Sequence, residues 1–309
     1  HSSHYNLVNI ALGIGDKVYF MNAKLSPIVA GVMNWGIWDK NLNELEMISL
    51  INSFLNQNIT SFDHADIYGG YSTEAAFGKA FSKSGIDRKS IQLITKCGIK
   101  LISDARNYKI KHYDYSAEYI IWSAENSLKN LKTDYLDVFL LHRPSPLLQP
   151  DEVAQAVTKL KSEGKIRSFG VSNFTNSQSA LLQKSVPIEY NQIQFSATNF
   201  EAMLDGSLDY MQSNQITPMA WNPLGGVFKE DTKQTRRLKK LLTNLVIKYE
   251  VSSDVILLAW ILQHPSNTIP VVGTTNITRI PQLNKALSLQ LEREDWFSIW
   301  TESQGNEVP

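Results

Sequence analysis

Short apolar runs recur along the chain, and polar stretches with a helical periodicity separate them. Near-continuous apolar runs of this kind are typical of parallel strands that are buried on both faces of a sheet. The pattern predicts eight strands, at residues 28–32, 60–63, 91–96, 136–141, 166–171, 190–193, 219–221 and 269–272.

The segments between the runs predict helices. Apolar residues repeat at helical spacing over 153–160, with Asp151 expected as the N-cap and Gly164 as the stop. The same pattern over 121–131 follows Ser116. Eight strands that are each followed by a helix predict a (β/α)8 TIM barrel rather than an open sheet.

The amino-terminal residues predict a β-hairpin ahead of the barrel. A Gly15-Asp16 turn has alternating apolar residues on both sides. These flanking residues are Val8, Ile10, Val18 and Phe20. We interpret residues 1–309 as one barrel domain, with residues 1–5 as a possible tag remnant or processed end.

Composition narrows the class of protein. Of the 309 residues 43% are hydrophobic, and 30 basic residues balance 30 acidic ones, which argues against disorder and against a nucleic-acid or membrane partner. No apolar run reaches the 18 residues that a membrane span needs. Cys97 is the single cysteine, so we expect a reducing, cytoplasmic compartment. The even charge distribution favours a monomer.

Four titratable side chains lie at the ends of the expected strands or a few residues after them. Asp63 ends the second strand, with Tyr68 five residues later; Lys96 ends the third, and His142 follows the fourth. Functional groups of a barrel collect at this edge. A lysine ammonium favours the phenolate form of a nearby tyrosine, so we expect Lys96 to lower the pKa of Tyr68 toward neutrality, with Asp63 keeping the ammonium charged.

Taken in order, these segments resemble the aldo-keto reductase family, from about Ile28 to the C-terminus. The matching segments are 63–69 (DHADIYG), 95–97 (TKC), 140–144 (LLHRP), 164–174 (GKIRSFGVSNF), 191–193 (NQI), 221–226 (WNPLGG) and 272–274 (VGT). The tail, residues 295–309, is most similar to a bacterial branch of predicted monomeric oxidoreductases.

The resemblance implies NAD(P)H-dependent reduction of an aldehyde or ketone to an alcohol. It makes Tyr68 the general acid, tuned by Lys96 and Asp63, and gives His142 the role of orienting the carbonyl. The implied cofactor contacts are Ser172, Asn173 and Gln192 on the carboxamide, Trp221 on the nicotinamide ring, Leu224, Gly225 and Gly226 along the pyrophosphate, and Thr274, Arg279 and Gln282 at the adenosine end.

One position departs from the family pattern. Many members carry a lysine where this chain has Gly273, so one phosphate-binding charge is missing. Arg279 can still bind a 2′-phosphate bidentately, and we therefore expect NADP as the cofactor, with NAD also possible. The loops that carry Asn34, Trp35 and Phe228 are expected to shape an apolar substrate pocket, with Trp35 alternatively a plug of the barrel.

Structural roles compete with each of these interpretations. Asp63 and Lys96 could form an interior ion pair, and Tyr68 or His142 could pack without taking part in chemistry. A cofactor-binding regulatory or redox-sensor subunit is the alternative function, because fold alone does not establish turnover. A metal-dependent hydrolase needs more ligands than Asp63 and His142 supply, and His64 and Asp66 are expected to cap a loop.

Overall fold

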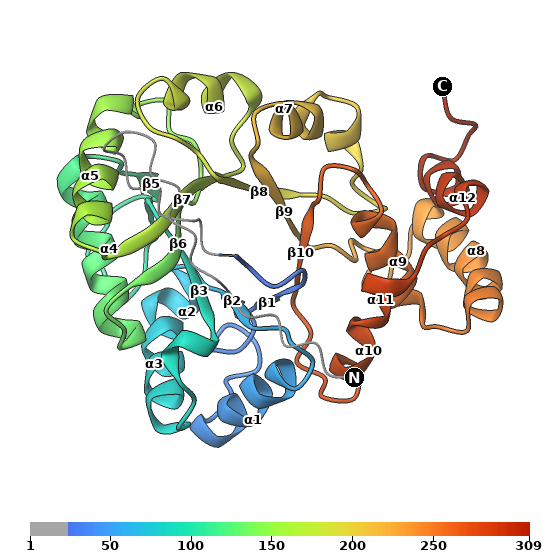
Figure 1. The fold of residues 1–309 in the computed structure, drawn as a ribbon, viewed down its shortest axis with the longest axis horizontal. Coiled ribbons are helices and arrows are strands. Elements are labelled where there is room, and N and C mark those ends of the chain that lie inside the picture. Colours follow the sequence, from blue (N-terminus) through green and yellow to red (C-terminus); the bar gives the residue numbers. More distant parts are fainter. Residues whose placement is uncertain (1–23) are drawn as a thin grey trace, which may run out of the picture.

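The computed structural model describes residues 24–309, and its centre is a closed barrel of parallel strands. The strands are adjacent in the order β1-β10-β9-β8-β7-β6-β3-β2, and every ladder between them is parallel. Figure 1 looks along the barrel and shows the helices outside the ring of strands. The (β/α)8 prediction is confirmed.

The bounds of the elements are as follows. The barrel strands are β1 (Val29–Gly31), β2 (Ser61–Asp63), β3 (Gln92–Cys97), β6 (Leu136–Leu141), β7 (Ile166–Ser172), β8 (Tyr190–Gln194), β9 (Thr217–Trp221) and β10 (Ile269–Val272). The helices are α1 (Glu44–Leu55), α2 (Tyr68–Tyr71), α3 (Thr73–Lys83), α4 (Ala117–Leu131), α5 (Pro150–Ser162), α6 (Asn176–Gln183), α7 (Ser207–Ser213), α8 (Lys233–Tyr249), α9 (Ser253–Leu262), α10 (Ile280–Leu283), α11 (Lys285–Ser288) and α12 (Arg293–Gln304), with short 3-10 turns at Arg88–Ser90 and Glu201–Met203.

The eight expected strands are all present, with bounds shifted by at most two residues. Ser116, after which the helical pattern was expected, is the N-cap of α4, since its side chain accepts from Tyr119 N. Asp151 is not an N-cap, because Pro150 begins α5 one residue earlier and Gln149 holds the cap position. The hairpin expected around Gly15 lies outside the described residues.

A second, two-stranded sheet was not predicted. Strands β4 (Ile99–Lys100) and β5 (His112–Tyr113) pair antiparallel between β3 and α4. These strands are too short and too polar to give a periodic signal. Because they follow β3 directly, they stand at the carboxyl edge of the barrel.

Apolar side chains fill two separate spaces. A small cluster inside the barrel includes Val29, Ile94, Val138 and Met219, whereas the larger core lies between the strands and the helices. Alternate residues of each strand therefore pack inward and outward, both against protein.

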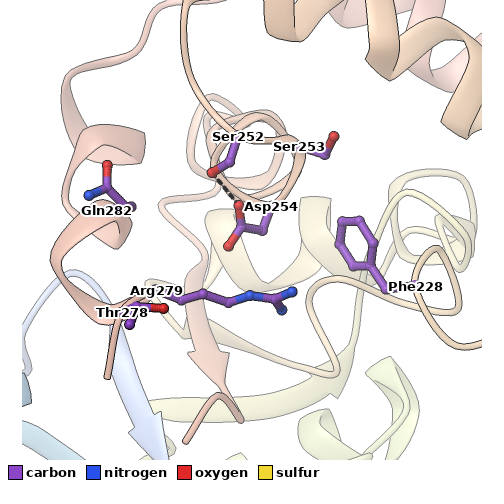
Figure 2. A pocket seen from close by; sticks show the side chains of 7 residues that line it. All are labelled: Phe228, Ser252, Ser253, Asp254, Thr278, Arg279 and Gln282. Carbon is purple, nitrogen blue, oxygen red and sulfur yellow. Dashed lines mark hydrogen bonds between the residues drawn. The ribbon is translucent and has the colours of Figure 1, made fainter. Parts of the chain in front are cut away.

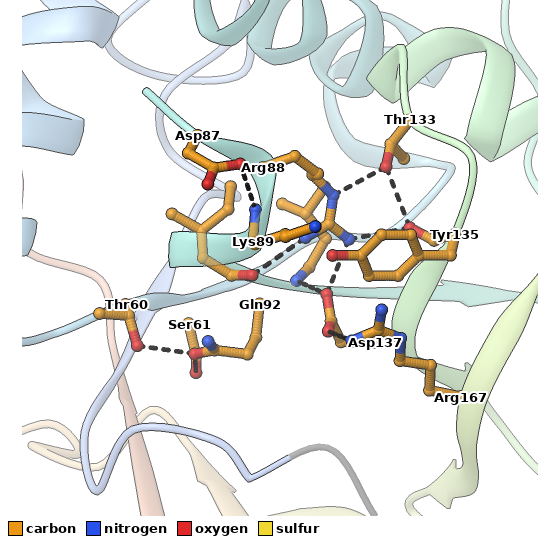
Figure 3. Close-up of polar contacts among 12 residues, drawn as sticks. Thr60, Ser61, Asp87, Arg88, Lys89, Gln92, Thr133, Tyr135, Asp137 and Arg167 are labelled. Atoms are coloured by element: carbon orange, nitrogen blue, oxygen red, sulfur yellow. Dashed lines mark hydrogen bonds and ion pairs between the residues drawn. The ribbon is translucent and has the colours of Figure 1, made fainter. Parts of the chain in front are cut away.

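Charged side chains hold the amino-terminal ends of the strands together (Figure 3). Asp137, which is buried, accepts from Arg88 Nη2 at 2.7 Å and from Leu93 N at 2.8 Å. The guanidinium groups of Arg88 and Arg167 lie over the Tyr135 ring at 3.9 and 3.8 Å. This edge of a barrel serves stability rather than chemistry.

A buried carboxyl group lies between the helices and the barrel wall. Glu74 of α3 accepts from Thr95 Oγ1 at 2.9 Å and from Ser127 Oγ at 3.1 Å, and it is 1% exposed. Burial raises the pKa of Glu74 to about 7, against the opposing effect of its two hydroxyl donors. The folded protein therefore retains a proton here between about pH 4.5 and 7 that the unfolded chain releases.

Retention of this proton predicts a pH-dependent effect of Glu74→Gln. Wild-type stability should fall as pH rises through this range, because the folded state binds more protons than the unfolded state. The variant lacks this loss, so its free energy of unfolding relative to wild type should rise by about 1–3 kcal/mol between pH 5 and pH 8. Urea unfolding of both proteins at pH 5 and pH 8 measures this difference in the free energy of unfolding. The exposed Glu118→Gln is the control, and identical pH slopes for Glu74→Gln and wild type would contradict the prediction.

Candidate active site

The barrel topology brings three of the four expected catalytic residues onto neighbouring strands. Strands β2, β3 and β6 are adjacent, with Asp63 at the end of β2, Lys96 in β3 and His142 directly after β6. Tyr68 is the first residue of α2, in the loop that follows β2. The polar groups therefore meet at the carboxyl edge.

Lys96 joins this group through hydrogen bonds. Its Nζ donates to Asp63 Oδ2 at 2.8 Å, to the His64 carbonyl oxygen at 2.7 Å and to Tyr68 Oη at 3.2 Å. Asp63 and Lys96 are 2% and 1% exposed, and Tyr68 is 8% exposed. The three protons of the ammonium group thus have three acceptors, so the buried charge is satisfied.

The expected lowering of the Tyr68 pKa is wrong for this structure. Burial raises the pKa of Tyr68 above its ordinary value; the nearby Lys96 ammonium lowers it, and Asp63 raises it again. The net direction is upward because desolvation of a phenolate outweighs the attraction of one cation that is itself paired. Tyr68 is therefore a neutral phenol, which is the form of a proton donor.

Lys96 remains an ammonium. Burial lowers its pKa, but the charge of Asp63 and the interaction with Tyr68 outweigh burial, and the net pKa is raised. The second carboxylate oxygen of Asp63 accepts from Gln192 Nε2 at 2.9 Å. Gln192, which the resemblance assigns to the nicotinamide carboxamide, fixes the Asp63 carboxylate in this structure.

His142 lies beside the tyrosine as a neutral ring. The two ring centroids are 6.4 Å apart at an interplanar angle of 81°, and His142 N donates to the Cys97 carbonyl oxygen at 2.9 Å. Burial, followed by the charge of Lys96, holds the pKa of His142 well below its usual range. Within residues 24–309 its Nδ1 has no hydrogen-bond partner. A neutral imidazole carries one N–H group, which can donate a hydrogen bond to a carbonyl oxygen.

Three further expected residues form one hydrogen-bonded group. Asn173 Nδ2 donates to Ser172 Oγ at 3.0 Å and to the His142 carbonyl oxygen at 3.2 Å, while its Oδ1 accepts from Trp221 Nε1 at 2.9 Å. Asn173 has φ 61°, a left-handed conformation that asparagine tolerates. The Trp221 ring is therefore held at a fixed position over the barrel end.

The turn after β9 contains the residues expected along a pyrophosphate, Leu224, Gly225 and Gly226. Gly225 has φ 57°, and a Cβ there would lie 1.9 Å from Thr198 Oγ1. Gly226 N donates to the same hydroxyl at 3.0 Å. The close approach of Thr198 therefore requires glycine at residue 225.

A cavity of about 310 Å³ lies where the adenosine end of a cofactor was expected (Figure 2). Arg279 and Gln282, which the resemblance assigns to that end, both line it. Figure 2 shows Arg279 extending below Asp254 toward Phe228. Phe228 also lines this cavity, and its assignment to the substrate pocket stays a prediction. Asp254, from the first turn of α9, is a lining residue that the sequence did not indicate.

The ends of β1 and β10 carry the remaining expected residues. A Cβ on Gly273 would meet only Asn34 Nδ2, at 3.7 Å, which is ordinary contact. Thr274 Oγ1 accepts from Asn276 N at 3.2 Å. A side chain therefore fits at residue 273.

Trp35 is not a wall of the substrate pocket. It is fully buried, with ring centroids 5.9–6.2 Å from those of Phe54, Phe62 and Phe77. The tryptophan of this loop that lies at the site is Trp38, which is 46% exposed, with its ring centroid 6.1 Å from that of Tyr68. The sequence places both tryptophans in one loop, and only the fold separates their environments.

The His64 and Asp66 side chains are buried core groups. His64 packs edge-on against Phe77 at 4.4 Å, and burial lowers its pKa to about 3. Burial raises the pKa of Asp66 well above its usual range.

In the part of the chain that the structure describes, no group of three His, Cys, Asp or Glu residues is placed to hold a metal ion. No helix among residues 24–309 is long and apolar enough to cross a membrane.

Comparison with known proteins agrees with this geometry. The model of the aldo/keto reductase family matches residues 27–301. The chain is 42% identical to the uncharacterized oxidoreductase YcsN of Bacillus subtilis, over 93% of this chain and 97% of that protein. It is 36% identical to a 6-dehydroglucose reductase of Agrobacterium fabrum, over 96% and 99% of the two chains.

A solved structure gives the same result for the fold. The crystal structure of the thermostable aldo-keto reductase Tm1743 superposes with a TM-score of 0.75 at 25% identity, and the match covers 90% of this chain and 95% of that one. The chain described here belongs to the aldo/keto reductase family.

Proposed function

We propose that this protein reduces an aldehyde or ketone to an alcohol with NADPH, and that Tyr68 is the general acid. The observation that carries the proposal is Lys96 Nζ within hydrogen-bond distance of both Asp63 and Tyr68. This arrangement holds a neutral phenol at the barrel edge and places a cation where negative charge develops on its oxygen.

Each residue has a defined part in the reaction. His142 donates a hydrogen bond to the substrate carbonyl oxygen and orients it. Tyr68 gives its proton to that oxygen as the alcohol forms, and Lys96 stabilises the phenolate until a solvent proton replaces the one lost. Bound NADPH would supply the hydride for the carbonyl carbon, so that the products are the alcohol and NADP⁺.

The residues at the barrel edge fit a nicotinamide dinucleotide. Asn173 and Ser172 offer amide and hydroxyl groups beside the half-buried Trp221, whose ring provides a stacking face. The cavity that Arg279 lines also contains the Phe228 ring and the Asp254 carboxyl group. The guanidinium would bind the 2′-phosphate of NADPH, and NADH would lack that contact.

The compartment and the oligomeric state of the protein stay predictions. The single thiol, Cys97, is buried and free, which suits a reducing, cytoplasmic setting. The monomeric state is likewise proposed from the sequence alone. A regulatory or redox-sensor subunit is disfavoured because a cofactor binder does not require a phenol beside a buried ammonium.

Tyr68→Phe tests the proposed function. Removing the proton donor should lower kcat about 10²–10⁴-fold, while the dissociation constant of NADPH stays within about threefold. NADPH oxidation, followed at 340 nm with a reactive aldehyde, measures kcat. Quenching of tryptophan fluorescence measures the dissociation constant of NADPH.

Tyr71→Phe is the matched control. Its hydroxyl is bonded to backbone atoms of Ile99 and Leu101 rather than to the site, so turnover should stay close to wild type. Retained turnover in Tyr68→Phe would contradict the assigned acid. Tight NADPH binding by wild type without turnover of any aldehyde would favour the sensor function.

Gly273→Lys tests the proposed cofactor. The added ammonium has room at this position and should lower the dissociation constant of NADPH by roughly five- to tenfold, with little change for NADH, because only NADPH carries the 2′-phosphate. Fluorescence titration with both cofactors measures the change. Gly273→Met, of similar length and without charge, is the control, and an equal gain for NADH would argue against a 2′-phosphate at this place.

A further inference from the structure

The segment between β3 and α4 places positive charge at the edge of the candidate site. Residues 99–113, which include β4 and β5, carry four basic residues against one carboxylate, Asp104. The four are Lys100, Arg106, Lys109 and Lys111. Only Lys100 has an ion-pair partner within residues 24–309, which is Asp114 at 2.6 Å. Since the whole chain is neutral, this is a local excess of positive charge.

Hydrogen bonds made by the two residues that follow this segment hold its end near His142. Asp114 N donates to the Gly98 carbonyl oxygen at 3.0 Å, directly after β3. Tyr115 Oη accepts from Arg143 N at 3.0 Å and donates to the Arg143 carbonyl oxygen. The chain from Lys111 to Tyr115 therefore lies beside His142 and Arg143.

Two exposed cations lie in the chain segments next to His142. Arg143 follows it in sequence, and Lys111 immediately precedes β5. Neither forms an ion pair with any residue that the structure describes, and both act on His142 electrostatically, since each lowers the pKa of its ring. Both charges therefore lie within range of a substrate whose carbonyl oxygen is bound by His142.

A solvated basic face is the competing explanation, and two observations argue against it. Arg106 is held between the rings of Tyr71 and Trp122, at 4.6 and 4.9 Å, so the segment is anchored rather than loose. Tyr71 lies three residues after the proton donor Tyr68, in the same short helix. The basic segment is thus packed onto the catalytic element itself.

We propose that this site selects carbonyl substrates that carry an anionic group, a carboxylate or a phosphate, through Lys111 and Arg143. The inference rests on the proposed function, because it assumes that the carbonyl is reduced beside His142. Cations at the rim attract an anionic substrate over about a Debye length and stabilise it once bound.

A matched pair of substrates tests the proposal. 4-Formylbenzoate and its methyl ester share the aldehyde and the ring and differ in charge. The ratio of kcat/KM for the acid over the ester should exceed about fivefold in wild type and fall about tenfold in the double variant Lys111→Gln/Arg143→Gln. Raising the salt concentration from about 0.05 M to about 0.5 M should lower the wild-type ratio.

The variants and controls keep the result interpretable. Only backbone atoms of Arg143 hold Tyr115, so replacing its side chain preserves that contact. Lys240→Gln, an exposed cation on α8, should leave the ratio unchanged. 4-Formylphenyl phosphate distinguishes the two anions, because a higher kcat/KM than the carboxylate would assign the site to phosphorylated carbonyl compounds.

The outcomes separate this inference from the proposed function. Turnover of the ester with a ratio at or below one, or a ratio that the double variant does not change, would overturn the anion selectivity and leave the reductase activity standing. Absence of turnover with all three aldehydes would contradict both the anion selectivity and the proposed reductase function.

Discussion

A buried ion pair determines the geometry of the site. Removing the Asp63 carboxylate and the Lys96 ammonium from water is costly, and such a pair persists only where the remaining hydrogen-bonding capacity is also satisfied. Here the ammonium has three acceptors, Asp63, the His64 carbonyl and Tyr68, while Gln192 donates to the second oxygen of the carboxylate. The phenol is therefore one of the groups that make burial of the charge tolerable.

The barrel supplies this arrangement through its strand order. Because β2, β3 and β6 are adjacent and parallel, their last residues meet at one edge without any long loop to position them. The loops after the strands then add further side chains around this group. In this chain the additions are the exposed Trp38 ring, the β4–β5 segment with its cations, and Asp254 beside Arg279.

Sequence alone predicted the features that depend on local pattern. Buried parallel strands produce apolar runs, and polar residues at their ends converge in any barrel, so the fold and the positions of Asp63, Lys96 and His142 followed directly. Features that depend on three-dimensional surroundings did not follow. Trp35 and Trp38 share one loop, yet only Trp35 meets three phenylalanines.

The prediction that the pKa of Tyr68 is lowered was wrong for a related reason. An ammonium next to a phenol is visible in a motif, whereas the desolvation of that phenol depends on how deeply the fold buries it. The cavity at Arg279 also could not be foreseen in full, because Phe228 and Asp254 reach it from different segments. The sequence pattern therefore does not show how deeply a single side chain is buried, nor which residues of distant loops meet.

The central claim is that a neutral, buried Tyr68 donates the proton. The most direct measurement is the pH dependence of kcat/KM for aldehyde reduction by the wild-type protein. Since the pKa of Tyr68 is raised above its ordinary value of about 10, activity should persist from neutral pH to about pH 9 and fall only at higher pH. A loss of activity with a midpoint near neutral pH would contradict the account, because the proton would then come from another group or from a phenol of lowered pKa.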